Sequence, residues 1–172
     1  MLTRPASDEF APYYERYVAA VPEGHPLDLL QQQRDEVWEL VASVPSEKER
    51  HRYAEGKWSV REVLGHMADA ERVFGHRAHR IARGDATPLP GFDENAYVAA
   101  SWFDVHPLAV WAEDFGRARA LTLHLFEHLP AEAFARRGTA SGYGVSVRAL
   151  LYICLGHAAH HLGVLRTRYL AD

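Results

Sequence analysis

The sequence has 172 residues and a mass of 19.4 kDa, which fits one domain of ordinary size. Its 48% hydrophobic and 24% charged residues are typical of a globular protein and exclude an intrinsically disordered chain. A formal charge of −4 argues against a nucleic-acid-binding protein, and the longest apolar run, residues 149–155, is far shorter than the roughly 20 residues of a transmembrane helix.

Residues 1–25 are predicted to form an N-terminal extension, because three prolines and a glycine leave room only for a short helix near residues 7–18. The first long helix is predicted over about residues 27–43, where leucine and valine recur on one face and Pro45 ends the pattern. We expect the rest of the chain to add three more long helices, so that residues 1–172 form a single domain.

The second long helix is predicted over about residues 60–83, with clear signals at both ends. Ser59 is suited to cap its N-terminus, and Glu62 stands three residues later to complete a capping box. Gly84 suits the left-handed conformation that often ends a helix. These signals mark both the start and the end of this helix.

Residues 84–106 form a long connection that contains Pro88, Pro90 and Gly91 before an aromatic stretch. Long connections in compact domains are often functional. Three aromatic side chains on this connection are candidates either for a wall over a functional site or for ordinary core residues: Tyr97, Trp102 and Phe103.

The last two long helices are predicted over about residues 107–129, ending before Pro130, and about residues 146–169, beginning at the cap Ser146. Three glycines within residues 138–144 mark the loop between them. The alternation that predicts strands is weak throughout. The sequence therefore predicts an all-α fold, a four-helix bundle with long connections.

The single cysteine, Cys154, excludes an internal disulfide and a cysteine-rich zinc module, and a core position suits it better than a metal-ligand role. The N-terminus lacks the apolar stretch of a secretory signal, so the cytoplasm is the expected location. The unusual feature of the composition is its 11 histidines, because imidazole is the commonest metal ligand in proteins.

Three histidines fall within the apolar faces of their predicted helices. With Val63 at 0° on the second long helix, His66 lies at about −60°, inside the apolar arc. On the last helix, His157 and His161 lie about 40° apart within the apolar face, whereas His160 lies at its edge. A buried imidazole nitrogen without a partner costs roughly 1–3 kcal/mol, and a shared zinc or nickel ion would provide one. These three side chains are the candidate metal ligands, with further positions open for water and substrate.

The other histidines have simpler interpretations. His124 and His128 are also four residues apart, but they lie at the margin of the third helix's apolar face and are expected to be partly exposed. The remaining ones are expected at the surface: His25, His51, His76, His79 and His106. The patterns Glu-x-x-His and His-Glu-x-x-His are absent, which argues against a di-iron bundle and a zincin protease.

Two carboxylates near His66 on the second long helix are candidates for supporting roles. Glu71 falls within the apolar arc, where it suits a general base or an acceptor that orients an imidazole. The simpler interpretation, which we favour, is a salt bridge between Glu71 and an arginine on a neighbouring helix. Asp69, one turn after His66, has similar standing, and a capping or surface position suits it better than a role in orienting an imidazole. The catalytic residues themselves stay unknown at this point.

Two stretches of the chain resemble motifs of the DinB/YfiT-like superfamily. Residues 58–71, WSVREVLGHMADAE, are similar to the motif on the family's second helix, and residues 157–163, HAAHHLG, are similar to the motif on its fourth. The likeness covers residues 27–170. It implies an up-down-down-up four-helix bundle that holds zinc or nickel through three histidines, which would be His66, His157 and His161.

The resemblance also implies a class of function. Members are often homodimers and are identified as metal-dependent hydrolases, and some relatives transfer low-molecular-weight thiols such as bacillithiol or mycothiol. We therefore expect a small-molecule substrate, with such a thiol as one candidate, and neither nucleic acid nor membrane as a partner. The leading hypothesis is a metal-dependent hydrolase or thiol S-transferase. The alternative is a non-catalytic bundle that binds a metal or a small molecule.

Overall fold

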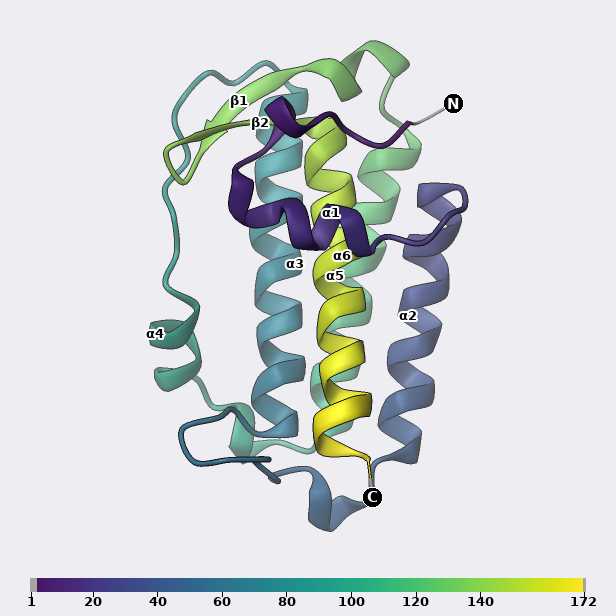
Figure 1. Cartoon of the computed structure of the whole chain (residues 1–172), viewed down its shortest axis with the longest axis vertical. Helices are drawn as coiled ribbons and strands as arrows, with labels where there is room; N and C mark the ends of the chain where they lie inside the picture. The colour runs from purple at the N-terminus through teal and green to yellow at the C-terminus, as the bar shows by residue number, and fades with distance from the viewer. Residues whose placement is uncertain (1–2, 172) are drawn as a thin grey trace.

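The structure, a computed structural model, describes residues 3–171. In this part of the chain four long helices form a bundle: α2 (Pro26–Ser43), α3 (Val60–Ala82), α5 (Leu108–Glu127) and α6 (Val147–Val164) (Figure 1). Helices α3 and α5 run in one direction, and α2 and α6 run in the other (Figure 1). This is the expected up-down-down-up topology. None of the described helices is both long and apolar enough to span a membrane.

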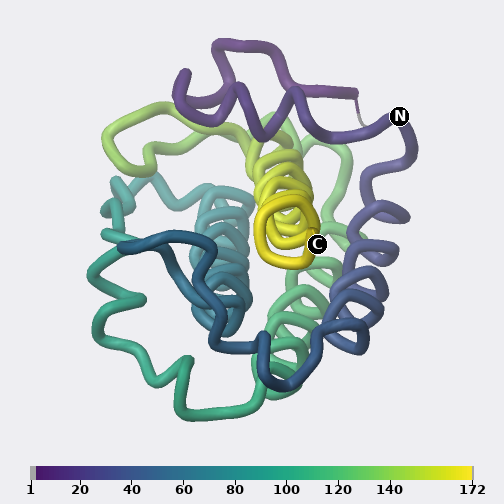
Figure 2. The backbone as a smooth tube through the Cα atoms, turned by 60° about the horizontal axis from the view of Figure 1, so that its bottom comes forward, coloured from purple at the N-terminus to yellow at the C-terminus, as the bar shows by residue number. Residues whose placement is uncertain are grey.

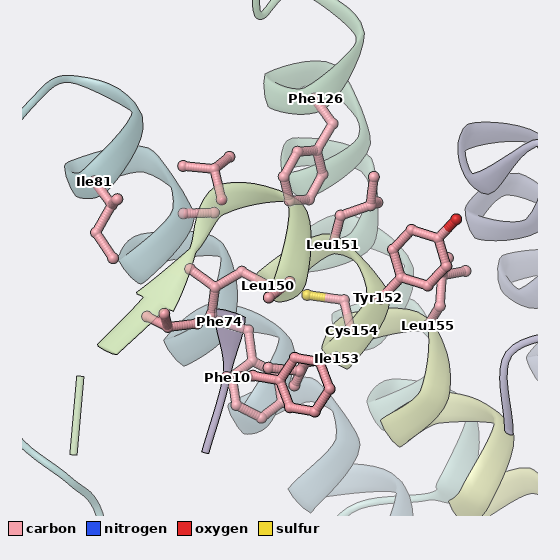
Figure 3. Close-up of a cluster of buried hydrophobic side chains, with 14 of the residues drawn as sticks. Phe10, Phe74, Ile81, Phe126, Leu150, Leu151, Tyr152, Ile153, Cys154 and Leu155 are labelled. Atoms are coloured by element: carbon pink, nitrogen blue, oxygen red, sulfur yellow. The ribbon is translucent and has the colours of Figure 1, made fainter. Parts of the chain in front are cut away.

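Helix α6 is buried on nearly all sides, which explains the apolar run in its sequence. Seen from the end of the bundle, it lies between the N-terminal segment and the other long helices (Figure 2). Its side chains pack among Phe10, Phe74 and Phe126, which come from three other parts of the chain (Figure 3). Cys154 is buried in the same cluster, and burial raises the pKa of its thiol. A helix that is apolar all round needs such cover on each face.

The N-terminal segment, predicted to be an extension, is packed against α6. It forms two 3₁₀ turns, Ser7–Glu9 and Pro12–Tyr14, and a short helix, α1 (Glu15–Ala20). Helix α1 crosses α6 at Gly156, where an added Cβ atom would clash with the carbonyl oxygen of Tyr17. The glycine therefore permits a backbone contact that a larger residue would prevent.

We expect Gly156→Ala to displace α1 and to lower the free energy of unfolding by about 1–3 kcal/mol, the usual cost of overpacking. Gly163→Ala is the matched control, because an added Cβ there meets nothing within 4 Å. That change should be neutral or stabilising by up to about 1 kcal/mol, since alanine favours a helix over glycine. Urea denaturation of both variants measures the difference. Equal midpoints would contradict the close crossing.

Glu9 connects the N-terminal segment to the start of α6 through hydrogen bonds. Its carboxylate accepts hydrogen bonds from Ser146 Oγ at 2.6 Å, from the Arg148 guanidinium and from the backbone N–H of Ala6 at 3.0 Å. Burial alone would raise the pKa of Glu9, but these hydrogen bonds lower it from 4.5 to about 2. The carboxylate is therefore held in its charged form.

This contact should make stability depend on pH. Because the folded-state pKa of Glu9 is depressed, its contribution is fully present above pH 4.5 and is lost as the pH falls toward 2. We expect Glu9→Gln to lower the free energy of unfolding at pH 7 by about 1–3 kcal/mol, because a charge-assisted hydrogen bond is lost. The variant should also lose less stability than the wild type between pH 5 and 3. Thermal unfolding across this pH range measures both effects, and parallel pH profiles would contradict the assignment.

The region between α5 and α6 contains a β-hairpin where we predicted only a loop. Strands β1 (Arg137–Ala140) and β2 (Tyr143–Ser146) pair antiparallel through a two-residue turn, Ser141 and Gly142, in which both residues have positive φ. The strands have only four residues each, too few for a clear alternation. Leu89 forms two backbone hydrogen bonds with the hairpin, at 2.9 and 3.0 Å, and so fixes the start of the long connection.

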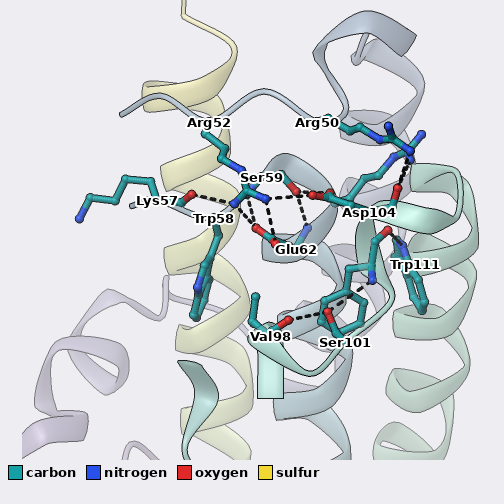
Figure 4. Close-up of polar contacts among 12 residues, drawn as sticks. Arg50, Arg52, Lys57, Trp58, Ser59, Glu62, Val98, Ser101, Asp104 and Trp111 are labelled. Carbon is teal, nitrogen blue, oxygen red and sulfur yellow. Dashed lines mark hydrogen bonds and ion pairs between the residues drawn. The ribbon is translucent and has the colours of Figure 1, made fainter. Parts of the chain in front are cut away.

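The start of α3 is held by a polar network (Figure 4). Ser59 caps the helix as predicted, since its Oγ accepts from the backbone N–H of Glu62 while the Glu62 carboxylate accepts from the Ser59 N–H. Ser59 Oγ also donates to Asp104 at 2.6 Å, and Arg52 pairs with both Asp104 and Glu62. Asp104 belongs to a 3₁₀ turn, Phe103–Val105, in the long connection. The network thus anchors that connection to the helix that carries His66.

The ends of the remaining elements differ little from the prediction. Helix α6 continues as one π-helical turn, Leu165–Tyr169, so the helical region ends where we expected. The long connection also contains a short helix, α4 (Glu94–Ala99), which the sequence analysis did not predict. Asp93 caps it by accepting from the backbone N–H of Ala96. Phe92, just before this helix, and Glu94, its first residue, line the pocket described below.

Candidate metal centre

Three histidine side chains from two helices meet inside the bundle. His66 lies in α3, and His157 and His161 lie one turn apart in α6. The Nε2 atom of His157 is 3.1 Å from that of His66 and 3.2 Å from that of His161. His66 and His157 are each only 6% exposed, and His161 is partly buried. The structure brings together the three imidazoles that the helical faces select.

The spacing of these nitrogens fits a shared divalent ion. Nitrogens bound at about 2.1 Å, with angles of about 90° to 110° between them, lie roughly 3.0–3.4 Å apart. Both observed separations fall in this range. A neutral imidazole has one N–H and one lone pair, so each of these rings can present a lone pair at Nε2 to a shared cation when its proton is on Nδ1. Within residues 3–171 no carboxylate or thiol joins the group, which leaves room for other ligands.

The environment keeps the imidazoles in the form that binds metals. Burial lowers the pKa of His66 from 6.5 to about 4. Burial, together with repulsion from the neighbouring histidines, lowers the pKa of His157 and His161 well below the usual range. Neutral imidazole is the ligand form, so a metal need not displace a proton from these side chains near neutral pH.

Aromatic rings hold the imidazoles in place. The ring of Trp58 packs 4.8 Å from that of His66, measured between centroids. The rings of Tyr17 and Phe74 meet His157 edge-on, at 5.4 and 5.5 Å. This packing restricts rotation of the imidazoles and covers them with apolar surface, which strengthens electrostatic interactions beside them.

A pocket of about 340 Å³ opens onto the histidines, and its walls come from parts of the chain that are far apart in sequence. It is lined by Tyr13, Tyr14, Arg16, Tyr17, Trp58, Phe74, Phe92, Glu94, Ser141 and the histidines. The sequence analysis did not predict that the N-terminal segment lines this pocket. The available signal was a cluster of three tyrosines around one arginine within residues 13–17, in a segment we interpreted as an extension.

Arg16 places a positive charge at this pocket. Its guanidinium lies 4.2 Å from the ring centroid of Tyr13 and 4.7 Å from that of Tyr17, and its Nη2 donates to the Tyr17 hydroxyl at 3.1 Å. Among the described residues no carboxylate forms a salt bridge with it. The guanidinium is therefore positioned by aromatic packing, with most of its N–H groups left for a ligand.

Neither of the two candidate carboxylates belongs to the three-histidine group. Both oxygens of Glu71 accept from Arg119 in α5, at 2.8 and 2.9 Å, and the pair is buried. This is the salt bridge to a neighbouring helix that we favoured. Asp69 lies 3.6 Å from Arg72, one turn along α3, and burial raises its pKa. The pocket is instead lined by the carboxylate of Glu94, which the sequence analysis did not select.

The remaining histidines lie away from the group or at its edge. His160 is exposed, and its ring packs against Tyr17 at 5.5 Å, which fits a neighbour rather than a ligand. The others are all exposed: His25, His51, His76, His79, His106, His124 and His128. For five of them this confirms the predicted surface position, and His124 and His128 are more exposed than expected.

The three aromatic residues of the long connection do not line the pocket, so their interpretation as a wall is wrong. Tyr97 and Trp102 are 49% and 74% exposed. Phe103 is a core residue whose ring packs directly on α3 at Gly65. A Cβ atom at that position would clash with the ring. The same connection lines the pocket through Phe92 and Glu94 instead.

A second pocket, of about 280 Å³, is lined by one of the three grouped histidines, His161. It shares Trp58, His160 and His161 with the first pocket, and Lys57 and Asn95 are among its other lining residues. His161 is therefore reached from two cavities. The two cavities therefore adjoin each other at these shared side chains.

The comparison with known families identifies a match over most of the chain. The sequence profile of the DinB superfamily matches residues 29–165. None of the curated proteins matches the sequence. The family match thus includes both helices that carry the three histidines.

The comparison with solved structures finds the same fold at low identity. One similar structure is YfiT from Bacillus subtilis, described as a probable metal-dependent hydrolase with an unusual four-helix bundle topology: the identity is 15%, the TM-score is 0.75, and the match covers 94% of this chain and 88% of that chain. Another is the mycothiol-dependent maleylpyruvate isomerase, at 16% identity and a TM-score of 0.65, covering 80% of this chain and 59% of that chain. A histidine-to-alanine variant of that isomerase is 14% identical, with a TM-score of 0.66, and the match covers 86% of this chain and 60% of that chain.

Proposed function

Since the chain belongs to the DinB superfamily, we propose that it is a metal-dependent enzyme in which His66, His157 and His161 hold a zinc or nickel ion. The observation that supports this proposal is the convergence of three Nε2 atoms, at 3.1 and 3.2 Å, beside an open pocket. A fourth protein ligand would favour a structural or storage role, and the described residues add none to the group. The homodimer, the cytoplasmic location and the single domain stay predictions.

The two pockets favour a reaction between two organic substrates, namely transfer of a low-molecular-weight thiol to an electrophile. When bound, the ion would supply Lewis acidity, which lowers the pKa of a coordinated water or thiol. In the transfer, the thiol sulfur bonds to an electrophilic carbon, the leaving group departs with the bonding electron pair, and the thiol proton passes to solvent. Hydrolysis is the alternative, which the likeness to YfiT supports and which requires only one of the two pockets.

The side chains around the ion would bind and orient the substrate. Trp58, Phe74 and Tyr17 provide apolar walls that exclude water from the histidines. Burial raises the pKa of the Tyr14 and Tyr17 hydroxyls, so both stay protonated and are available as hydrogen-bond donors. Arg16 offers its free N–H groups to an anionic part of the substrate.

The test compares metal-free protein with protein reloaded with zinc or nickel, on a panel of electrophiles with and without added thiol. Thiol transfer predicts turnover that needs both metal and thiol. Turnover that needs metal but no thiol would contradict thiol transfer and support hydrolysis. If the reloaded protein binds metal and small molecules but turns over no member of the panel, the non-catalytic alternative is favoured.

Arg16→Ala should weaken the binding of anionic substrates selectively. Because a charge-assisted hydrogen bond contributes roughly 1.5–3 kcal/mol, KM for a substrate with a carboxylate should rise about 10-fold to 100-fold, with little change in kcat. A neutral analogue of the same substrate serves as the control and should keep its KM. Steady-state kinetics on the two compounds measure this selectivity, and an equal effect on both would contradict the proposed contact.

A further inference from the structure

A second group of metal-binding side chains lies at the C-terminal end of α5, apart from the three-histidine group. His124, Glu127 and His128 each offer one donor atom, and these atoms lie within 4.8 Å of one another. We propose that they form a peripheral site for a divalent transition-metal ion such as zinc. Two imidazoles and a carboxylate are a donor set that zinc uses in proteins, with positions left open for other ligands.

A hydrogen bond prepares His128 to act as a ligand. Its Nδ1 lies 2.8 Å from the carbonyl oxygen of His124. A carbonyl oxygen only accepts, so Nδ1 carries the proton and Nε2 keeps its lone pair. Histidines that bind metals usually have the other ring nitrogen fixed in this way. The ring of His124 lies beside it, with 4.3 Å between the centroids.

The local electrostatics favour a cation. These residues occupy the last turn of α5 and the position just after it, which is the negative end of the helix dipole. Glu127 adds a negative charge, and within residues 3–171 no arginine or lysine forms a salt bridge with it. By contrast, Glu113 in the first half of the same helix pairs with Arg117. An ion would therefore meet a carboxylate that is already available.

The geometry also predicts that this site is weaker than the three-histidine group. Donors around one ion lie roughly 3.0–3.4 Å apart, so atoms separated by up to 4.8 Å must move closer on binding. All three side chains are exposed, and holding the His124 and Glu127 side chains in one position costs conformational entropy. The buried histidines are already at ligand spacing. Zinc should therefore fill the buried group first and the peripheral site second.

Other histidines nearby provide a matched control. A pocket of about 520 Å³ between α3 and α5 is lined by His124 and His128 and, from α3, by His76 and His79. His76 and His79 are exposed as well, but they do not belong to the group of close donors. A variant without them removes the same number of imidazoles from the same face of the bundle.

The experiment titrates zinc into metal-free protein against a competing chromophoric chelator. The wild type should bind two ions per chain, one tightly and one weakly. His124→Ala/His128→Ala should lower the affinity for the second ion by at least about tenfold and leave the affinity for the first unchanged. His76→Ala/His79→Ala should keep both ions. Circular dichroism checks that each variant is folded.

Each unfavourable outcome has a clear meaning. The peripheral site is overturned if the wild type binds one ion only, if His124→Ala/His128→Ala keeps both, or if the control variant loses the second ion. His161→Ala separates this proposal from the ligand set of the buried group, because it should lose the tight ion and keep the weak one. Loss of both ions in His161→Ala would contradict the independence of the two sites.

Discussion

Replacing His161 with alanine should remove the tightly bound zinc or nickel ion, whereas replacing His160 should not. The Nε2 atom of His161 lies 3.2 Å from that of His157, while His160 is exposed and packs on Tyr17. Loss of a residue that only orients a ligand costs 10-fold to 100-fold in metal affinity, so loss of a ligand should cost at least about 100-fold. Metal analysis after dialysis against a buffered metal solution measures the effect.

The pair of variants is informative because the two histidines are adjacent in α6. Both changes remove one imidazole near the same pocket, so a general effect on folding or charge would appear in both. Trp58 gives an independent readout, since its ring lies 4.8 Å from that of His66 and its fluorescence should respond to metal binding. The ligand set is wrong if His161→Ala retains a full equivalent of tightly bound metal, or if His160→Ala loses as much as His161→Ala.

The pairing of His66 with His157 and His161 could be predicted because helical periodicity reports which side chains face inward. An imidazole within an apolar face must find a partner inside the protein, and three of them need a shared one. The same reasoning placed His161 within the apolar face and His160 at its edge, and so distinguished a candidate ligand from a neighbouring histidine. It also predicted that Glu71 needs a partner, although a single helix does not show which residue of another helix lies opposite.

The walls of the site could not be predicted, because they depend on contacts between distant segments. The tyrosines near residue 17 reach the histidines only because Gly156 lets α1 cross α6 closely. Ser141 reaches the pocket through a hairpin whose strands are too short to recognise from alternation. Periodicity describes one element at a time, so it predicts the ligands on a helix face but not the segments that cover them.

Replacing Arg119 with methionine should lower the free energy of unfolding by about 3–5 kcal/mol, among the largest effects of any single change in this chain. Arg119 is fully buried in α5 and joins the other three long helices. Its guanidinium donates to Glu71 in α3, to Gln33 in α2 at 2.8 Å and to the carbonyl oxygen of Cys154 in α6 at 3.5 Å. Without it, the Glu71 carboxylate would be buried and unpaired.

A second change should recover part of this loss. In Arg119→Met/Glu71→Met the buried charge is gone, and replacing both members of a buried ion pair with apolar residues is often neutral. The double variant should therefore be more stable than Arg119→Met alone. Arg117→Met is the control, because Arg117 forms an exposed pair with Glu113 and its loss should change stability by less than about 0.5 kcal/mol. Urea denaturation compares the three. If the double variant is no more stable than the single one, Arg119 stabilises the bundle by packing and not by neutralising Glu71.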